Sequence, residues 1–274
     1  MIVDSHIHVW PLDEKRQPPA YVKNKPTAPA LVEWLVEDME KYHIDRAVLI
    51  QASVWGWDNS YMFECLERYP GLFKAMGLVD PLSDTCAEDL RALMKDGLSG
   101  IRLHPLYYPE LPCWIDSPRH ERLWQVAEET SAILQFHMLP WHAVPLARMV
   151  DRHPTVRVIV DHLGKPDVTE APPYPSYQPV LDLARRPLVW IKIGDVEVAS
   201  KAGYPWRDVV PFVCAAKEAF GPGRMVWGTD QPGAARRLPL EQKLHFLREE
   251  LRPCVSPAEL DQILGSTPKA LFGF

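Results

Sequence analysis

The chain has 274 residues, of which 47% are hydrophobic and 24% charged, a composition typical of folded globular proteins and not of disordered chains. The formal net charge is −6 and no basic patch is evident, so neither nucleic acid nor an anionic membrane is an expected partner. No apolar run reaches the ~18 residues of a membrane span, and the first residues lack a signal-peptide pattern, so we expect a cytoplasmic protein.

The chain opens with an apolar strand that carries two histidines. Because side chains of a strand alternate between its faces, His6 and His8 should point in the same direction, with Asp4 one step behind. Two neutral imidazoles on one strand can bind a divalent cation or, without a metal, polarise a carbonyl group. This pair is therefore the first candidate for a functional site.

Seven further apolar runs alternate with amphipathic segments. We expect strands at 2–8, 46–51, 72–79, 99–104, 132–138, 156–161, 188–194 and 224–229. We expect helices at 30–42, 60–69, 86–95, 119–130, 143–152, 179–185, 208–220 and 240–251. Eight such units favour parallel pairing and closure as a single α/β domain over 1–274, a (β/α)8 TIM barrel. An open doubly wound sheet is the alternative, but no glycine-rich phosphate loop follows the first strand.

Proline-rich stretches punctuate this pattern. Residues 11–29, 105–118 and 166–179 should be loops that follow strands and build the rim of the barrel. Residues 256–274 should form one or two helices that pack on the outside.

Polar residues recur at the predicted carboxyl ends of the strands, which meet at one end of a barrel. Strand four places Arg102 and His104 on one face, and strand five does the same with Gln135 and His137. Strand six should deliver His162 in phase with its three valines, and strand eight should deliver Asp230 in phase with Val226 and Gly228. Each histidine alone could be a hydrogen-bonded core residue, and Asp230 alone could cap a helix. Together with the first strand they predict an active site.

The same residues resemble a known family. The runs that begin at Asp4 and Gly100, the Asp-His-Leu-Gly-Lys-Pro run at 161–166 and Gly-Thr-Asp at 228–230 are similar to the amidohydrolase-2 group of the amidohydrolase superfamily. That group includes 2-pyrone-4,6-dicarboxylate, sulfomuconolactone and sugar lactonases, and the 161–166 run favours this lactonase branch. Strand four offers Arg102 and His104 where binuclear members have a bridging lysine or glutamate, which argues against a two-metal site.

The resemblance implies a mechanism. His6, His8, His137 and Asp230 would bind one divalent ion, zinc or manganese, with Asp230 as general base and His162 stabilising the oxyanion or relaying protons. In a metal-independent version the histidines polarise the lactone carbonyl, and Asp230 alone activates water. Both versions need the same residues.

The substrate should be a small ring that is carboxylated or hydroxylated. Arg102 is the candidate anchor for a carboxylate, with a buried ion pair as its alternative role. His104, Tyr107 and Tyr108 adjoin it, and Gln51, Trp55 and Trp57 follow strand two as a polar end with aromatic walls. Lys165 and Lys192 are weaker candidates, and Lys192 points inward only if strand seven is in phase with Trp190 and Gly194.

The five cysteines, Cys65, Cys86, Cys113, Cys214 and Cys254, are odd in number and dispersed, which favours reduced thiols with packing roles. The preferred function is a lactone hydrolase. The alternatives are a metal-dependent decarboxylase or hydratase on the same scaffold, and a non-catalytic barrel that binds a metabolite. Many barrels dimerise, so a homodimer is compatible with the sequence.

Overall fold

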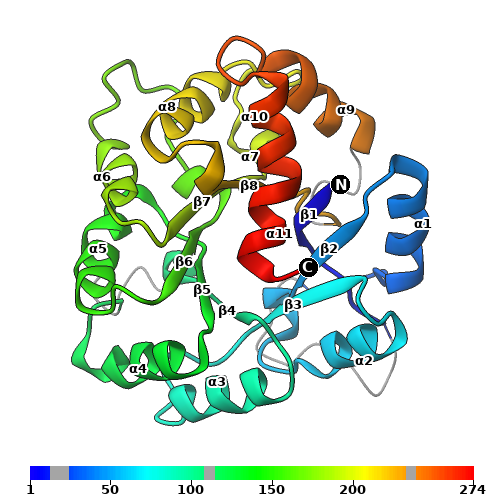
Figure 1. The fold of residues 1–274 in the computed structure, drawn as a ribbon, viewed down its shortest axis with the longest axis vertical. Helices are drawn as coiled ribbons and strands as arrows, with labels where there is room; N and C mark the ends of the chain where they lie inside the picture. Colours follow the sequence, from blue (N-terminus) through cyan, green and yellow to red (C-terminus); the bar gives the residue numbers. More distant parts are fainter. Residues whose placement is uncertain (13–24, 108–114, 233–238) are drawn as a thin grey trace.

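Eight parallel strands run in sequence order around a (β/α)8 barrel in this computed structural model, which describes residues 1–12, 25–107, 115–232 and 239–274 (Figure 1). The strands are β1 Val3–Ile7, β2 Arg46–Ile50, β3 Phe73–Gly77, β4 Gly100–Leu103, β5 Ile133–Phe136, β6 Arg157–Val160, β7 Val189–Ile193 and β8 Met225–Trp227. Each lies within one of the eight predicted ranges, so the predicted fold class is confirmed.

Most of the helices surround the strands on the outside, as Figure 1 shows. They are α1 Val32–Tyr42, α2 Ser60–Arg68, α3 Cys86–Lys95, α4 Glu121–Thr130, α5 Ala143–Arg152, α6 Gln178–Asp182, α7 Val196–Ala199, α8 Val210–Phe220, α9 Leu240–His245, α10 Pro257–Asp261 and α11 Thr267–Phe272. In α5, buried Leu146, Met149 and Val150 recur at helical spacing, which gives the helix one apolar face toward the strands. Residues 166–177 connect β6 to α6, as predicted, whereas parts of the other two proline-rich stretches lie outside the described residues.

The barrel closes where the first strand meets the last. Ile7 forms an isolated parallel bridge with Gln231. The backbone N–H of Asp230 donates to the His6 carbonyl at 2.8 Å, and that of His8 donates to the Gln231 carbonyl at 2.6 Å. Gly228 makes this approach possible, since a Cβ at its position would lie 2.3 Å from the Cβ of His6. The closure therefore brings His6, His8 and Asp230 to the same place.

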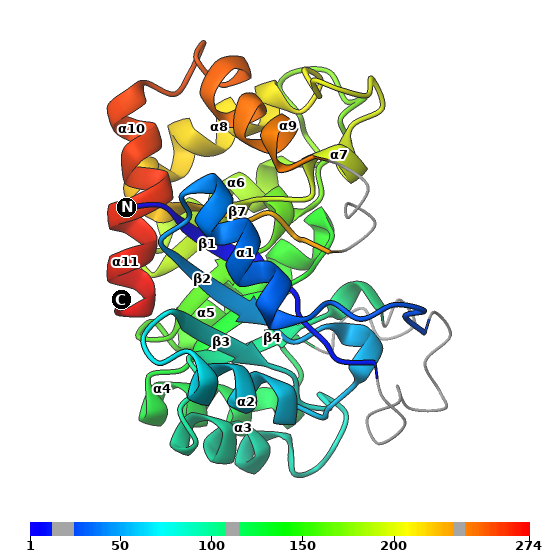
Figure 2. The ribbon, with the colours of Figure 1, turned by 90° about the vertical axis from the view of Figure 1, so that its right-hand side faces the viewer.

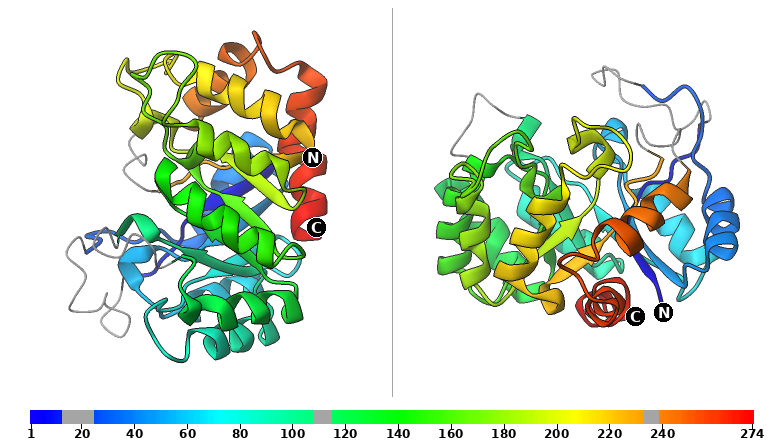
Figure 3. Two further views of the ribbon diagram at one scale, coloured as in Figure 1. Left: turned by 90° about the vertical axis from the view of Figure 1, so that its left-hand side faces the viewer. Right: turned by 90° about the horizontal axis from the view of Figure 1, so that it is seen from above.

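The part of the barrel interior that faces the amino-terminal ends of the strands is apolar. It contains Val48, Ile50, Met76, Ile133, Ile159 and Val226, which pack against Leu271 and Phe272 of the C-terminal helix α11. Figures 2 and 3 show α11 lying across the amino-terminal ends of the strands, with both chain ends on that side. Arg157 fixes α11 there by donating to the Leu271 carbonyl at 2.8 Å. The predicted C-terminal helices are confirmed, and α11 forms the floor of the barrel.

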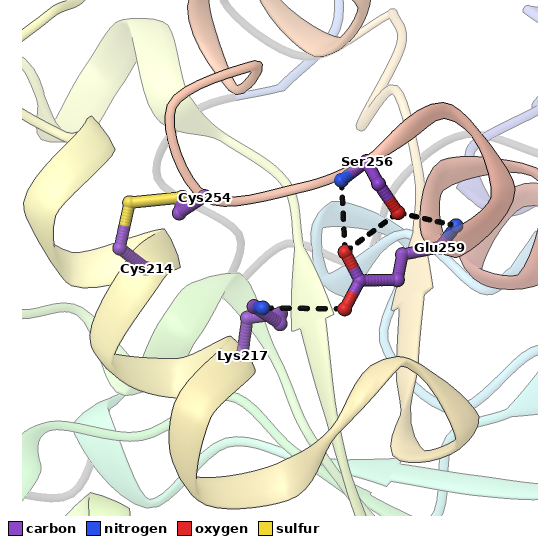
Figure 4. Close-up of a disulfide and its surroundings, with 5 residues drawn as sticks. All are labelled: Cys214, Lys217, Cys254, Ser256 and Glu259. Carbon is purple, nitrogen blue, oxygen red and sulfur yellow. Dashed lines mark hydrogen bonds and ion pairs between the residues drawn. A yellow bond between two sulfur atoms is a disulfide. The ribbon is translucent and has the colours of Figure 1, made fainter.

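Two of the cysteines form a disulfide, contrary to the expectation of reduced thiols. Cys214 on α8 is bonded to Cys254 in the segment before α10, with 5.5 Å between the two Cα atoms (Figure 4). Nearby, Lys217 pairs with Glu259 at 3.2 Å, and Ser256 and Glu259 form the capping box of α10. Cys65 and Cys86 are free and buried, and Cys113 lies outside the described residues. Because two cysteines are bonded to each other, the cysteines no longer support a cytoplasmic location. That location stays a prediction.

Among the described residues, we find no helix whose length and apolar character would suffice to cross a membrane.

Candidate active site

His6 and His8 converge on one carboxylate, as their spacing predicts. The Nε2 atoms of His6 and His8 lie 3.1 Å and 3.3 Å from the same oxygen, Oδ1, of Asp230. Their rings are 5.0 Å apart and nearly perpendicular. The pairing of β1 with β2 is irregular between Asp4 and Ile7, at the point where the chain carries His6. All three side chains lie at the carboxyl ends of their strands, where barrel active sites form.

The backbone of Asp230 is left-handed, with a φ of 56°, which is uncommon for a residue other than glycine. The surrounding contacts hold this conformation. The carboxylate of Asp4 accepts from the N–H of Thr229 at 3.0 Å and from its hydroxyl at 2.6 Å. The Lys243 ammonium of α9 donates to the Thr229 carbonyl and pairs with Glu197 of α7. Asp4 therefore supports Asp230 from β1 instead of entering the site.

The carboxyl of Asp230 stays ionised at neutral pH. Burial by itself would raise its pKa, but the imidazoles of His162 and His6 outweigh burial and hold the pKa well below its usual range. Burial acts in the other direction on His6 and lowers its pKa to about 4, with the Lys192 ammonium adding to the effect. An ionised Asp230 beside a neutral His6 is therefore the working state near pH 7.

Five imidazoles form an arc across the mouth of the barrel. Their ring centroids are separated by 5.0 Å from His8 to His6, 4.8 Å to His162, 5.2 Å to His137 and 5.6 Å to His104. Burial lowers the pKa values of His104, His137 and His162 well below the usual value. These three rings are therefore neutral and can donate or accept hydrogen bonds.

His162 reaches the site from a short helical turn and not from β6 itself. It has a φ of 50° and opens the turn His162–Gly164. The predicted strand phase was wrong: Val158 and Val160 belong to the outer core, whereas Ile159 points into the barrel. Both faces of a barrel strand pack against apolar neighbours, so three alternating valines did not identify the inner face. The correct phase places Asp161 inside.

Asp161 is the functional candidate that the sequence reasoning missed. It is fully buried, and its Oδ2 accepts from Nε of Arg102 at 2.7 Å and from Nε2 of Gln135 at 2.9 Å. Its Oδ1 lies 3.1 Å from the Lys192 ammonium and 3.4 Å from Nδ1 of His6. Burial would raise the pKa of Asp161, but the Lys192 and Arg102 charges hold it well below the usual range. In the sequence, its position directly before His162 was the signal that could have identified it.

Lys192 is also fully buried, and it points inward together with Trp190 and Gly194. Lys192 therefore has the inward phase on which its place among the candidates depended. Trp190 packs against the apolar interior cluster, and Gly194 leaves room for His162, whose Nδ1 would lie 3.0 Å from an added Cβ.

The candidate substrate residues have structural partners. Arg102 is buried, forms an ion pair with Asp161 and donates through Nη2 to Nε2 of His162 at 3.0 Å. Its surroundings therefore match the alternative role, a buried ion pair. The Gln51 amide donates to the Asp58 carbonyl within its own loop, and Trp55 is buried there. Whether Arg102, His104, Gln51 or Trp55 contacts substrate stays a prediction. The Tyr107 side chain and Tyr108 lie outside the described residues.

The predicted metal ligands assemble in part. Ligand atoms of His6, His8 and Asp230 lie within 4.8 Å of one another, whereas His137 is not in this group. A second group, His162, Asp195 and Asp230, shares the Asp230 carboxylate. Nδ1 of His8 lies 2.7 Å from the Ile50 carbonyl and must donate to it, so its Nε2 presents a lone pair toward Asp230. A lone pair facing a carboxylate oxygen fits a cation between them, so these residues are compatible with a divalent ion.

A second carboxylate lies beside Asp230. Asp195 follows β7, with a φ of 55°, and pairs with the Lys165 ammonium at 3.0 Å. Burial and the neighbouring Asp230 raise the pKa of Asp195 to about 6. Lys165 itself lies in the turn after β6, at the rim.

Comparison with known proteins gives one consistent family. The family model described as "Amidohydrolase" matches residues 3–274. The chain is 27% identical to 4-sulfomuconolactone hydrolase of Hydrogenophaga intermedia, over 98% of this chain and 88% of that protein. It is 30% identical to the 2-pyrone-4,6-dicarboxylate hydrolase of Comamonas testosteroni, over 68% of this chain and 62% of that protein. A probable 2-pyrone-4,6-dicarboxylic acid hydrolase from Acinetobacter baumannii, solved with citric acid, superimposes with a TM-score of 0.85 at 22% identity, covering 100% of this chain and 99% of that one.

Proposed function

This chain belongs to the amidohydrolase family of enzymes, and from that membership we propose that it opens a small lactone ring by adding water. The observation that carries the proposal is the convergence of His6 and His8 on the ionised Asp230 carboxylate at the mouth of the barrel. Relatives named as hydrolases of 4-sulfomuconolactone and 2-pyrone-4,6-dicarboxylate support a cyclic ester as the substrate class.

Asp230 is the proposed general base. Its carboxylate removes a proton from a water molecule as the water oxygen forms a bond to the lactone carbonyl carbon. The ring C–O bond then breaks, the Asp230 proton passes to the departing alkoxide, and the product is an open-chain hydroxy acid. Since Asp230 begins and ends ionised, it is regenerated in each cycle.

The imidazoles around Asp230 have a second proposed role. As the carbonyl oxygen gains negative charge, a ring N–H directed at it would stabilise that charge, as oxyanion donors do in other acyl transfers. Nε2 of His162 lies 3.7 Å from Asp230 and accepts from the Arg102 guanidinium, so the neutral ring carries its own N–H on Nδ1. Its proposed function is to stabilise the oxyanion or relay a proton.

His6, His8 and Asp230 are the residues that would hold a divalent ion, zinc or manganese. Such an ion would supply Lewis-acid polarisation of the carbonyl and a more acidic bound water. His137, the fourth predicted ligand, lies further along the arc of imidazoles and would have to move to join them. The metal-independent version relies on the same three side chains, so both versions remain part of the proposal.

The proposed substrate is a small cyclic ester that carries carboxylate or hydroxyl groups. Lys165 and Asp195 at the rim, with Arg102 beneath, provide charged and hydrogen-bonding groups around the reacting centre. A homodimer also stays a prediction.

The test is a pH-stat assay of ring opening on a panel of carboxylated and neutral lactones, since hydrolysis releases acid. We expect Asp230→Asn to lower kcat by roughly 10³-fold or more while the circular dichroism spectrum is unchanged. Asp182→Asn, at a partly exposed carboxylate of α6, is the matched control and should keep wild-type activity. Proton uptake with release of carbon dioxide would instead support a decarboxylase. Activity unaffected by Asp230→Asn would contradict the mechanism.

A further inference from the structure

The buried ammonium of Lys192 lies directly beneath His6. Its nitrogen is hydrogen-bonded to Oε1 of Gln135 at 2.9 Å and to Nδ1 of His6 at 3.2 Å, and it forms an ion pair with Oδ1 of Asp161 at 3.1 Å. An ammonium group has three N–H donors and no acceptor, so it can only donate in both hydrogen bonds. Nδ1 of His6 can therefore only accept from a protonated Lys192.

The remaining bonds of this cluster agree with that assignment. The amide of Gln135 is oriented by three bonds, because its nitrogen donates to Asp161 and lies 3.4 Å from Nδ1 of His6, while its oxygen accepts from Lys192. Asp161 already accepts from Arg102 and Gln135 through Oδ2, and its Oδ1 is closer to Lys192 than to His6, at 3.1 Å against 3.4 Å. The Asp161 carboxylate is thus paired with both Arg102 and Lys192. Lys192 lies nearer to Nδ1 of His6 than Asp161 does.

We propose that Lys192 is a positioning residue that fixes His6 as the tautomer with its proton on Nε2. Nε2, with its proton, then lies 3.1 Å from Oδ1 of Asp230. His8 has the opposite tautomer, because the Ile50 carbonyl takes its Nδ1 proton. The two neighbouring imidazoles therefore differ: His6 offers an N–H to the site, and His8 offers a lone pair.

This difference has a consequence for metal binding. A divalent ion needs the Nε2 lone pair of His6, so the ring proton must move to Nδ1, where it faces the Lys192 ammonium. Lys192 therefore opposes metal ligation by His6 and favours its use as a hydrogen-bond donor. The inference concerns the site of the proposed function, but its test observes His6 in the substrate-free protein and not turnover.

The first measurement is the tautomer of His6 by long-range ¹H–¹⁵N correlation on protein labelled at histidine nitrogen and stripped of metal. The His6 signals are assigned by their loss in His6→Asn. We expect the protonated, pyrrole-type nitrogen of His6 to be Nε2 in the wild type. In Lys192→Met we expect it to be Nδ1, which can then donate to Asp161. A wild-type His6 protonated at Nδ1 would overturn the proposal, and this result needs no variant of Lys192 to fold.

The second measurement is zinc affinity, determined by competition with a chromophoric chelator. We expect Lys192→Met to bind zinc roughly tenfold more tightly than the wild type, the scale of effects from groups that contact a ligand histidine. Lys217→Met removes an equal charge from the distant pair with Glu259 and should leave the affinity unchanged. Equal or weaker binding by Lys192→Met would overturn the proposal. If the wild-type protein opens no lactone in any assay, the proposed function is refuted. Both measurements can still be made and interpreted, because neither depends on turnover.

Discussion

Three residues of the candidate site have a strained backbone. His162, Asp195 and Asp230 follow three adjacent strands, and each has a left-handed backbone with φ between 50° and 56°. Such conformations cost about 1–3 kcal/mol each for residues with a side chain, so the surrounding contacts must compensate. The turns they create direct three side chains to one point, which straight strands would not do. The left-handed conformations of these three residues therefore help to assemble the site.

The pKa values predict the pH dependence of the reaction. Burial lowers the pKa of His6 to about 4, and the pKa of Asp230 is held well below its usual range, so both keep their working forms above pH 5. We expect kcat/KM to be level from about pH 5.5 to 8 and to fall only near pH 4, where His6 gains a proton. Circular dichroism at each pH separates this fall from acid unfolding. An acid limb near pH 6 would contradict the prediction and implicate Asp195 or Asp4, since burial raises the pKa of each to about 6.

Gly228 predicts a sharp steric effect. A Cβ there would lie 2.3 Å from Cβ and 2.6 Å from the backbone nitrogen of His6, so Gly228→Ala must push β1 away from β8. Because small displacements of reacting groups can cost about 10²-fold in rate, we expect a loss of that order in kcat/KM, measured on the ring-opening reaction. Gly223→Ala is the control, since its added Cβ would meet only the end of the Gln262 side chain. Full activity in Gly228→Ala would show that His6 need not be held in place.

At the scale of elements, α9 acts on the site from a distance. Its Lys243 is buried, pairs with Glu197 of α7 and donates to the carbonyl of Thr229, the residue before Asp230. Removing one partner of a buried ion pair leaves the other charge uncompensated, so we expect Lys243→Met to destabilise the protein by about 3–5 kcal/mol. The measurement is chemical denaturation followed by fluorescence.

The double variant Lys243→Met/Glu197→Gln separates the two roles of Lys243. We expect it to regain much of the stability, because no buried charge is left without a partner, but not the wild-type kcat, because the Thr229 carbonyl still lacks its donor. Recovery of both quantities would show that Lys243 is structural only.

The strands show which parts of the site a sequence can and cannot predict. All eight strands and the histidines of β1 followed from apolar runs and alternation, since these patterns depend on local geometry. The inward phase of β6 did not, because Val158, Ile159 and Val160 are apolar on both faces. Asp161 was missed for that reason, and the interactions of Lys192 depend on partners from β1, β5 and β6 that no local pattern brings together. Long-range pairing, not local structure, limits the prediction.

At the scale of the whole molecule, the disulfide ties α8 to the C-terminal helices. It joins residues 40 apart in sequence, a spacing with no local signature. By the loop-entropy estimate, closing a loop of that length stabilises the folded state by about 4 kcal/mol. We therefore expect dithiothreitol to lower the free energy of unfolding and the Tm. Cys214→Ser should show the lower Tm without reductant and no further response to it. An unchanged wild-type Tm under full reduction would contradict the prediction.

The floor of the barrel comes from α11, since Leu271 and Phe272 cover the apolar interior layer around Ile133 and Ile159. Because α11 follows all eight strands in the sequence, ribosomal synthesis delivers the strands before this cover, and the open end of the barrel exposes aliphatic side chains until residues 267–272 have been made. Exposed surface of this kind on a partly synthesised chain is a substrate for chaperones or a starting point for aggregation. The barrel core is therefore shielded from water only once α11 has docked.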